Sequence, residues 1–253
     1  MSTVDRPTRR DERRAQTIRE IKALAMQQVS DGGPEAVSLT GIVRAMSMSP
    51  AALYRYFDGR DALLADLVVD AYDAFADALA EVERGSGTAV EHLRAVLHRT
   101  RSWAIEHPNA YVLVFQTTIG SGKDFNVERT VAASSRSMAV LVGALADVTA
   151  DAPVARDGAS ATREDAAATP PTDRDVVRAV SEWARRSGLE GIPVEVLALA
   201  LATWTRLHGV ISLELGGHLE ATGIGGAVLF GAEVDTILAS ALTLAPVASA
   251  ASG

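Results

Sequence analysis

The chain has 253 residues, 48% of them hydrophobic, which is enough to bury one large core or two modest ones without covalent cross-links. Because it contains no cysteine, the sequence excludes disulfide frameworks, thiolate zinc sites and thiol nucleophiles. The net charge of −8 is uneven, since residues 1–64 hold ten Lys and Arg against eight acids while the remainder is strongly acidic. This asymmetry favours a protein whose N-terminal part meets a polyanion.

The N-terminus predicts neither a signal peptide nor a membrane anchor. Residues 1–14 are rich in arginine and contain no apolar stretch. The most apolar long segment, 194–215, is interrupted by Glu195, Arg206, His208 and Glu214, so it lacks the clean run of about 20 apolar residues that a membrane span needs. We therefore expect a soluble, cytoplasmic protein with no membrane partner.

Helices are predicted along almost the whole chain, because apolar residues recur every three or four positions. The first helix runs from about 11 to 30 and ends at two glycines and a proline. Ser38 and Ser49 are candidate N-caps of two short helices, the first ending near Met46 and the second, with Pro50 in its first turn, by Gly59. The remaining helices are expected at about 60–84, 88–106, 109–118, 125–149, 173–187, 193–219 and 226–244.

One segment, 150–172, is rich in Ala, Asp, Thr and Pro and contains no large apolar residue, which predicts a mobile loop. The other segments place the chain in the all-α class.

The two short helices at 38–58 have the pattern of a helix-turn-helix. Their inner faces are apolar, with Leu39, Ile42, Val43 and Met46 opposite Met48, Leu53 and Phe57. The outer face of the second helix is small or polar, as entry into a DNA major groove about 12 Å wide requires. It comprises Ser49, Pro50, Ala51, Ala52 and Arg55.

This segment resembles the DNA-binding domain of the tetracycline-repressor (TetR) family, whose recognition helix often reads Ser-Pro-x-x-Leu-Tyr-x-x-Phe. The matching residues are Ser49, Pro50, Leu53, Tyr54 and Phe57, followed by Arg60-Asp-Ala-Leu-Leu64, and the likeness covers residues 11–75. The resemblance implies phosphate contacts by Ser38, Thr40, Tyr54, Tyr56 and Arg60, and base contacts by Pro50, Ala51, Ala52 and Arg55. Phosphate contacts position a protein on DNA, and base contacts select the sequence.

Two residues depart from the family pattern, because Ser47 stands in the turn where glycine is usual and Val43 stands where alanine is usual. A serine takes up a left-handed backbone conformation only at a cost. The arginines before residue 15 are compatible with either a solvated tail or an arm that contacts DNA.

The C-terminal part resembles the TetR subgroup with a Trp-x-x-x-His-Gly signature, through Trp204, His208 and Gly209 and an upstream His107-Pro108 motif. The resemblance implies a homodimer formed by the helices at 193–219 and 226–244. It also implies a ligand cavity between the preceding helices. We expect a mostly apolar cavity for an uncharged or weakly anionic small molecule, lined by Trp103, Tyr111, Phe115, Gln116, Met138, Trp183, Trp204 and His208.

No catalytic or cofactor motif is complete in the sequence. Gly120-Ser-Gly-Lys123 is similar to a phosphate loop, but Thr117 stands in place of its first glycine and Asp124 in place of its Ser or Thr. A metal site at His208 and His218 is disfavoured, because a lone histidine on an apolar helix is more often a core residue. We expect no enzyme activity, no cofactor and no metal.

The sequence therefore predicts a basic flexible arm at 1–10, a helix-turn-helix domain in an N-terminal three-helix bundle at 11–59, and a helical ligand-binding and dimerisation domain at 60–253. The expected function is that of a repressor, released from a palindromic operator in double-stranded DNA by an unknown small apolar effector. A helical ligand carrier or interaction protein, without specific DNA binding, is the alternative.

Overall fold

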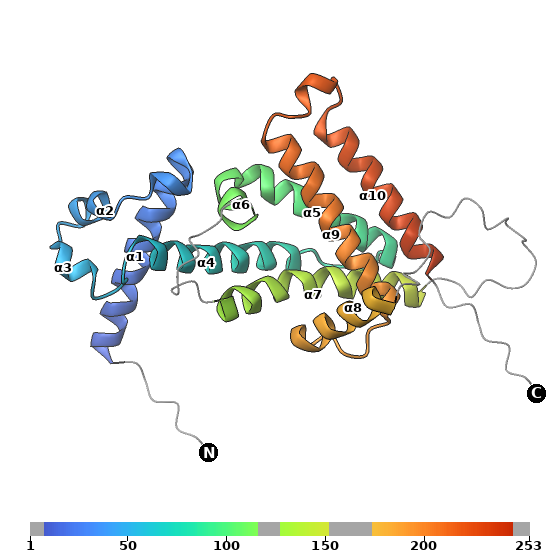
Figure 1. Ribbon diagram of the computed structural model, residues 1–253, viewed down its shortest axis with the longest axis horizontal. Coiled ribbons are helices and arrows are strands. Elements are labelled where there is room, and N and C mark those ends of the chain that lie inside the picture. Colours follow the sequence, from blue (N-terminus) through green and yellow to red (C-terminus); the bar gives the residue numbers. More distant parts are fainter. Residues whose placement is uncertain (1–7, 116–126, 152–173, 245–253) are drawn as a thin grey trace, which may run out of the picture. The chain divides into compact units, whose positions relative to one another are not determined.

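The computed structural model describes residues 8–115, 127–151 and 174–244, and within these ranges it contains helices and no strand. The all-α prediction is thereby confirmed (Figure 1). The helices are α1 (Arg9–Gly32), α2 (Leu39–Ala45), α3 (Pro50–Leu53), α4 (Arg60–Ala80), α5 (Ala89–Glu106), α6 (Pro108–Phe115), α7 (Val127–Asp151), α8 (Arg174–Ser187), α9 (Val194–Leu215) and α10 (Gly226–Thr243), with single turns of 3₁₀ helix at Pro34–Ala36 and Glu220–Thr222.

Two compact units make up the chain, and each is built from two stretches of sequence. The first contains the residues up to Tyr72 together with 107–131, and the second contains 73–106 together with the residues from 132 onwards. This division differs from the expected boundary at residue 59. The first half of α4 and all of α6 belong to the first unit, because their apolar faces pack there.

The core of the first unit lies between α1 and the helices that follow it. α1 begins at Thr8, whose side chain forms a capping box with Asp11, and ends at Gly33 with φ 77°. Its buried face is a stripe at helical spacing. Lys22 ties α1 to α4 through ion pairs of 3.2 and 2.8 Å with Asp66 and Asp70. The buried residues of α1 are Ile21, Ala25 and Val29.

α6 completes this core, although it follows α5 of the second unit in sequence. Leu113 is 1% exposed and lies in the same apolar cluster as the helix-turn-helix residues. The side chain of Asn109 donates a hydrogen bond of 2.6 Å to the carbonyl oxygen of Ser30, near the end of α1. The ring of Tyr72 on α4 meets that of Phe115 edge-on at 5.6 Å. The helix-turn-helix is thus supported by a segment from the middle of the chain.

The second unit is organised around α9 and α10, which pack against each other and against α5. Arg101 on α5 forms an ion pair with both carboxylate oxygens of Glu214 on α9. Arg136 on α7 pairs with Asp73 and Asp77 on α4. These bridges join helices that are distant in sequence, and the core of the unit is filled mainly by buried aliphatic side chains.

Several predicted helices end earlier than expected; α3 ends at Leu53 rather than near residue 58, and α9 ends at Leu215 rather than at residue 219. α4 ends at Ala80 rather than Arg84, and Arg84 instead pairs with Asp147 and Asp151 on α7. Of the loop expected at 150–172, the first two residues form the last turn of α7, and the rest lies outside the described residues.

Among the described helices, α9 and α10 are long and apolar enough by composition to cross a membrane, each with a mean hydropathy of 1.4. One face of each helix is buried within the second unit, as in the core helices of soluble proteins. The apolar composition of α9 and α10 is therefore accounted for by their packing within the second unit.

Candidate nucleic-acid interface

The two short helices of the first unit both begin at a serine that caps them. The Ser38 hydroxyl oxygen accepts a hydrogen bond of 3.2 Å from the backbone N–H of Gly41, and that of Ser49 accepts one of 3.2 Å from Ala52. Each cap satisfies one of the N–H groups that a helix start leaves unpaired. Because each hydroxyl accepts here, its own hydrogen can be donated to another acceptor, such as a phosphate oxygen.

The turn between α2 and α3 depends on Ser47. Its φ of 51° makes it the one non-glycine residue with positive φ among the described residues. A side chain in this left-handed region costs about 1–2 kcal/mol relative to the right-handed one. The family's glycine would remove that cost, so the departure noted in the sequence is a real strain in the fold.

The inner faces of α2 and α3 hold the two helices together. Ile42, Leu53 and Phe57 are at most 6% exposed and belong to the core cluster of the first unit. The other predicted inner residues are partly buried against the same cluster, namely Leu39, Val43, Met46 and Met48. This packing fixes the orientation of α3 relative to α1, and it leaves the opposite face of α3 in solvent.

That outer face presents the residues expected to meet DNA. Pro50, Ala51 and Arg55 are exposed, Ala52 is half-buried, and Tyr54 is 55% exposed with its ring in solvent. Thr40 is exposed on the first turn of α2. The face is small at its start and has a cation and a phenol at its end, so it can donate hydrogen bonds to base edges and phosphates.

Arg60 is not oriented toward this face. Its guanidinium donates hydrogen bonds to the carbonyl oxygens of Val37 and Pro34, at 3.1 and 2.7 Å, and it also pairs with Glu35. The side chain therefore joins the start of α4 to the segment before α2. These bonds use three of the five N–H donors of the guanidinium, which gives Arg60 a supporting role in the fold beside the expected phosphate contact.

Tyr56 is half-buried, and the guanidinium of Arg14 lies 5.1 Å from the centre of its ring. Arg14 also donates to the carbonyl oxygen of Arg55, at 3.3 and 3.4 Å. The sequence was compatible with either a solvated tail or a DNA-contacting arm for the N-terminal arginines. Their spacing is the signal that was available, since residues four apart on a helix project from the same side, as Arg10 and Arg14 do.

The residues expected to line an effector cavity are divided between the two units. Tyr111 and Phe115 belong to the first unit, where their rings stand 4.9 Å apart, and Tyr111 is only 1% exposed. Trp103 belongs to the second unit and packs in its core against Phe75. Gln116 lies outside the described residues. The expected residues therefore do not form one cluster within either unit.

Four further members of that set lie in the second unit. Met138 and Trp183 are half-buried, whereas Trp204 is 39% exposed on α9. The ring of Trp204 lies 5.1 Å from that of His208, one turn further along the helix. Burial lowers the pKa of His208 to about 4, so this histidine is neutral at physiological pH. Groups of acidic and histidine side chains suited to a metal ion do not occur among the described residues.

One face of α9 and α10 exposes large apolar side chains. Leu213 on α9 is 44% exposed, and on α10 Val228 and Leu242 are 71% and 45% exposed. Gly209 and Ala239 are small exposed residues of the same two helices, and residues of this size allow another helix to approach closely. Leu238, which lies in the helix at 226–244 expected to form the dimer, is 3% exposed and belongs to the core of its own protomer.

A capped helix-turn-helix with an exposed second helix, joined to a larger helical unit, defines a DNA-binding transcription regulator. Residues 21–67 match the family of bacterial regulatory proteins of the tetR type, and residues 93–237 match the tetracyclin repressor-like C-terminal domain. The chain therefore belongs to the TetR family. Both C-terminal motifs singled out in the sequence lie within the second matched range.

Similar proteins that carry a functional name support the assignment to this family. The chain is 30% identical over 220 residues to HTH-type transcriptional regulators of Mycobacterium tuberculosis and Mycobacterium bovis, covering 84% of this chain and 86% of theirs. Among solved structures, SCO4313, described as a regulatory protein, is 32% identical with a TM-score of 0.70, covering 91% of this chain and 99% of that one. A Rhodococcus sp. RHA1 protein of unknown function shares the fold, at 21% identity, a TM-score of 0.56, and coverage of 94% and 97%.

Proposed function

We propose that the protein is a homodimeric repressor that binds a palindromic operator and leaves it when a small molecule binds its second unit. The observation that supports this most directly is the exposed outer face of α3, with Arg55 and Tyr54 in solvent while Leu53 and Phe57 are buried beneath. A helix held in this way can enter a major groove without rearrangement of its core.

The proposed contacts fall into two groups. Arg55, together with the small residues Pro50, Ala51 and Ala52, faces the bases, and arginine can bind guanine through two parallel hydrogen bonds. The hydroxyl groups of the phosphate-binding group donate to the DNA backbone. That second group comprises Ser38, Thr40, Ser49, Tyr54 and Tyr56. Arg60 contributes mainly by holding the segment before α2.

The proposed dimer forms through the exposed apolar face of α9 and α10, around Val228 and Leu242. Two-fold symmetry places the same surface of both subunits in contact, and it requires an operator with matching symmetry. The two recognition helices must then stand about 34–36 Å apart to enter successive major grooves. Family membership supports such a pairing, and a cytoplasmic location follows from access to DNA in a bacterial cell.

The proposed switch acts through α4. Its residues up to Tyr72 belong to the first unit and those from Asp73 to the second, so one helix is part of both cores. An effector that favours a different placement of α4 would disfavour the DNA-bound spacing. A coupling of about 1–3 kcal/mol is typical for such linkage between two sites. The half-buried Met138 and Trp183 of the second unit remain candidates for contact with a largely apolar effector.

Selection of DNA from a pool of random duplexes tests the proposal. The purified protein is expected to enrich a sequence with two inverted half-sites, and to lose it steeply as salt rises. Enrichment of no sequence, with retention independent of salt, would instead favour a helical carrier or interaction protein. The N-terminal match to DNA-binding regulators is the observation that ranks this alternative second.

A further inference from the structure

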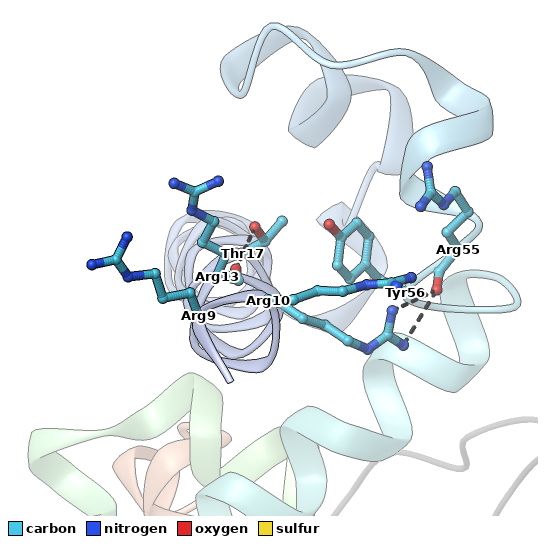
Figure 2. A pocket seen from close by; sticks show the side chains of 7 residues that line it. Arg9, Arg10, Arg13, Thr17, Arg55 and Tyr56 are labelled. Atoms are coloured by element: carbon cyan, nitrogen blue, oxygen red, sulfur yellow. Dashed lines mark hydrogen bonds between the residues drawn. The ribbon is translucent and has the colours of Figure 1, made fainter. Parts of the chain in front are cut away.

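Four arginines of the first two turns of α1 line a groove next to the end of the recognition helix (Figure 2). The groove has a volume of about 580 Å³ and lies entirely within the first unit. Its lining residues are Arg9, Arg10, Arg13, Arg14, Thr17, Arg55 and Tyr56. It adjoins the helix-turn-helix but includes none of the residues of α2.

The groove is strongly positive, because five of its lining residues are arginines and none is acidic. Within the described ranges, none of its five arginines forms an ion pair with a carboxylate. Two acids, Asp11 and Glu12, stand between these arginines in sequence, and neither lines the groove. Asp11 is bonded to Thr8 in the capping box, and these hydrogen bonds lower its pKa. Planar guanidinium groups gathered in this way match the oxygens of a phosphate.

Arg14 connects the groove to the recognition helix. Its guanidinium donates to the carbonyl oxygen of Arg55 and lies over the ring of Tyr56, so the start of α1 is fastened to the residues that follow α3. In Figure 2 the guanidinium of Arg55 points away from this carbonyl. The backbone carbonyl of Arg55 therefore binds Arg14 of α1, and the side chain of Arg55 is not used in this contact.

We propose that this groove binds the sugar–phosphate backbone of duplex DNA beside the major-groove contacts of α3. The inference rests on the proposed function, since it needs the duplex that α3 recognises. Arg10 reaches into the groove toward Tyr56, and Arg13 projects from the outer side of α1 (Figure 2). Both supply charge to phosphates, and Arg14 is a positioning residue. The footprint on DNA therefore extends beyond the helix-turn-helix.

Phosphate contacts are measured by the dependence of DNA affinity on salt. Each neutralised phosphate adds about −0.9 to the slope of log K against log salt for duplex DNA. Arg10→Ala and Arg13→Ala are expected to make that slope shallower by about one each. Both should weaken the selected operator and random duplexes by the same factor, because no base is read there. The control is Arg19→Ala, an exposed arginine of α1 outside the groove.

Replacement of Arg14 is expected to change DNA binding in a different way from replacement of Arg10 or Arg13. Arg14→Lys retains the charge but loses the fork that donates to Arg55, so it should change base preference near Arg55 as well as affinity. Melting curves show whether each variant stays folded.

The inference is overturned if Arg10→Ala and Arg13→Ala keep the wild-type slope, as Arg19→Ala should. The inference would also be contradicted if the groove bound inorganic phosphate while Arg10→Ala and Arg13→Ala left the salt dependence of DNA affinity unchanged. If the wild-type protein binds no duplex at all, the proposed function fails together with this inference.

Discussion

The guanidinium of Arg60 donates a hydrogen bond of 2.7 Å to the carbonyl oxygen of Pro34, in the turn that precedes the helix-turn-helix. A second bond of 3.1 Å reaches the carbonyl of Val37, whose side chain is buried in the core. Arg60 thus fixes the entry to α2 from the first residue of α4. This conformation gives the arginine at position 60 a structural role, which is independent of the proposed contact with DNA.

Replacement of Arg60 by alanine should lower the free energy of unfolding by about 1–3 kcal/mol, because the partly buried carbonyl groups of Val37 and Pro34 each lose one hydrogen-bond donor. Lysine should restore only part of this loss, since it cannot reach both carbonyls with a planar fork. Urea denaturation of the three proteins measures the difference. Equal stability of wild type and Arg60→Ala would contradict the supporting role.

Arg55→Ala should relax the DNA sequence preference, because an arginine bound to guanine through two hydrogen bonds supplies about 1–3 kcal/mol of discrimination. Tyr54→Phe removes one exposed hydroxyl and should weaken all duplexes equally, by about 1 kcal/mol. Binding of each variant to the selected sequence and to single-base variants separates the two effects. An unchanged preference in Arg55→Ala would show that α3 is oriented differently on DNA.

Ser47→Gly should stabilise the protein by up to about 1 kcal/mol. It removes the left-handed strain at φ 51°, and the greater freedom of glycine in the unfolded chain offsets part of the gain. A rise in Tm of about 2–4 °C corresponds to this energy for a chain of this size. Ser47→Ala, which retains the strain, is the matched control. A lower Tm for the glycine variant would refute this account of the turn.

Leu242→Arg should yield a folded monomer, because Leu242 is 45% exposed on the face proposed to pair two subunits. Leu238→Arg should instead abolish folding, since Leu238 is 3% exposed in the core. Val176→Arg on α8 is the control, as Val176 is 42% exposed and lies outside the proposed face. Light scattering gives the mass of each variant. A dimeric Leu242→Arg protein would place the interface elsewhere.

Acid should destabilise the protein through His208. Its pKa is about 4 in the folded state against 6.5 for a free histidine. Between pH 4 and pH 6.5, the histidine is therefore protonated in the unfolded chain and neutral in the folded one. The stability contributed by the neutral ring is complete above about pH 6.5 and is lost as the pH falls toward 4, by up to about 2 kcal/mol at pH 5. His208→Gln should show a smaller loss between pH 7 and pH 5, measured at one protein concentration. An equal loss of stability in wild type and His208→Gln would show that His208 is not the cause of the acid sensitivity.

The sequence by itself determined the features that depend on neighbours along the chain. Apolar spacing predicted the helices, and the serine and proline at residues 49 and 50 predicted where α3 begins, because caps and turns act over three or four residues. The inner face of the helix-turn-helix followed from the same periodicity. The strain at Ser47 was also visible, since a left-handed turn position penalises any side chain.

Tertiary structure alone decided which faces of distant segments meet. Asn109 and Leu113 join the first unit from beyond α5, and nothing in their local pattern distinguishes that packing from packing in the second. Trp103 is buried while Trp204 is 39% exposed, although both stand on apolar helices. Burial and hydrogen-bond partners depend on contacts between residues far apart in sequence, and helical periodicity specifies a face but not its partner.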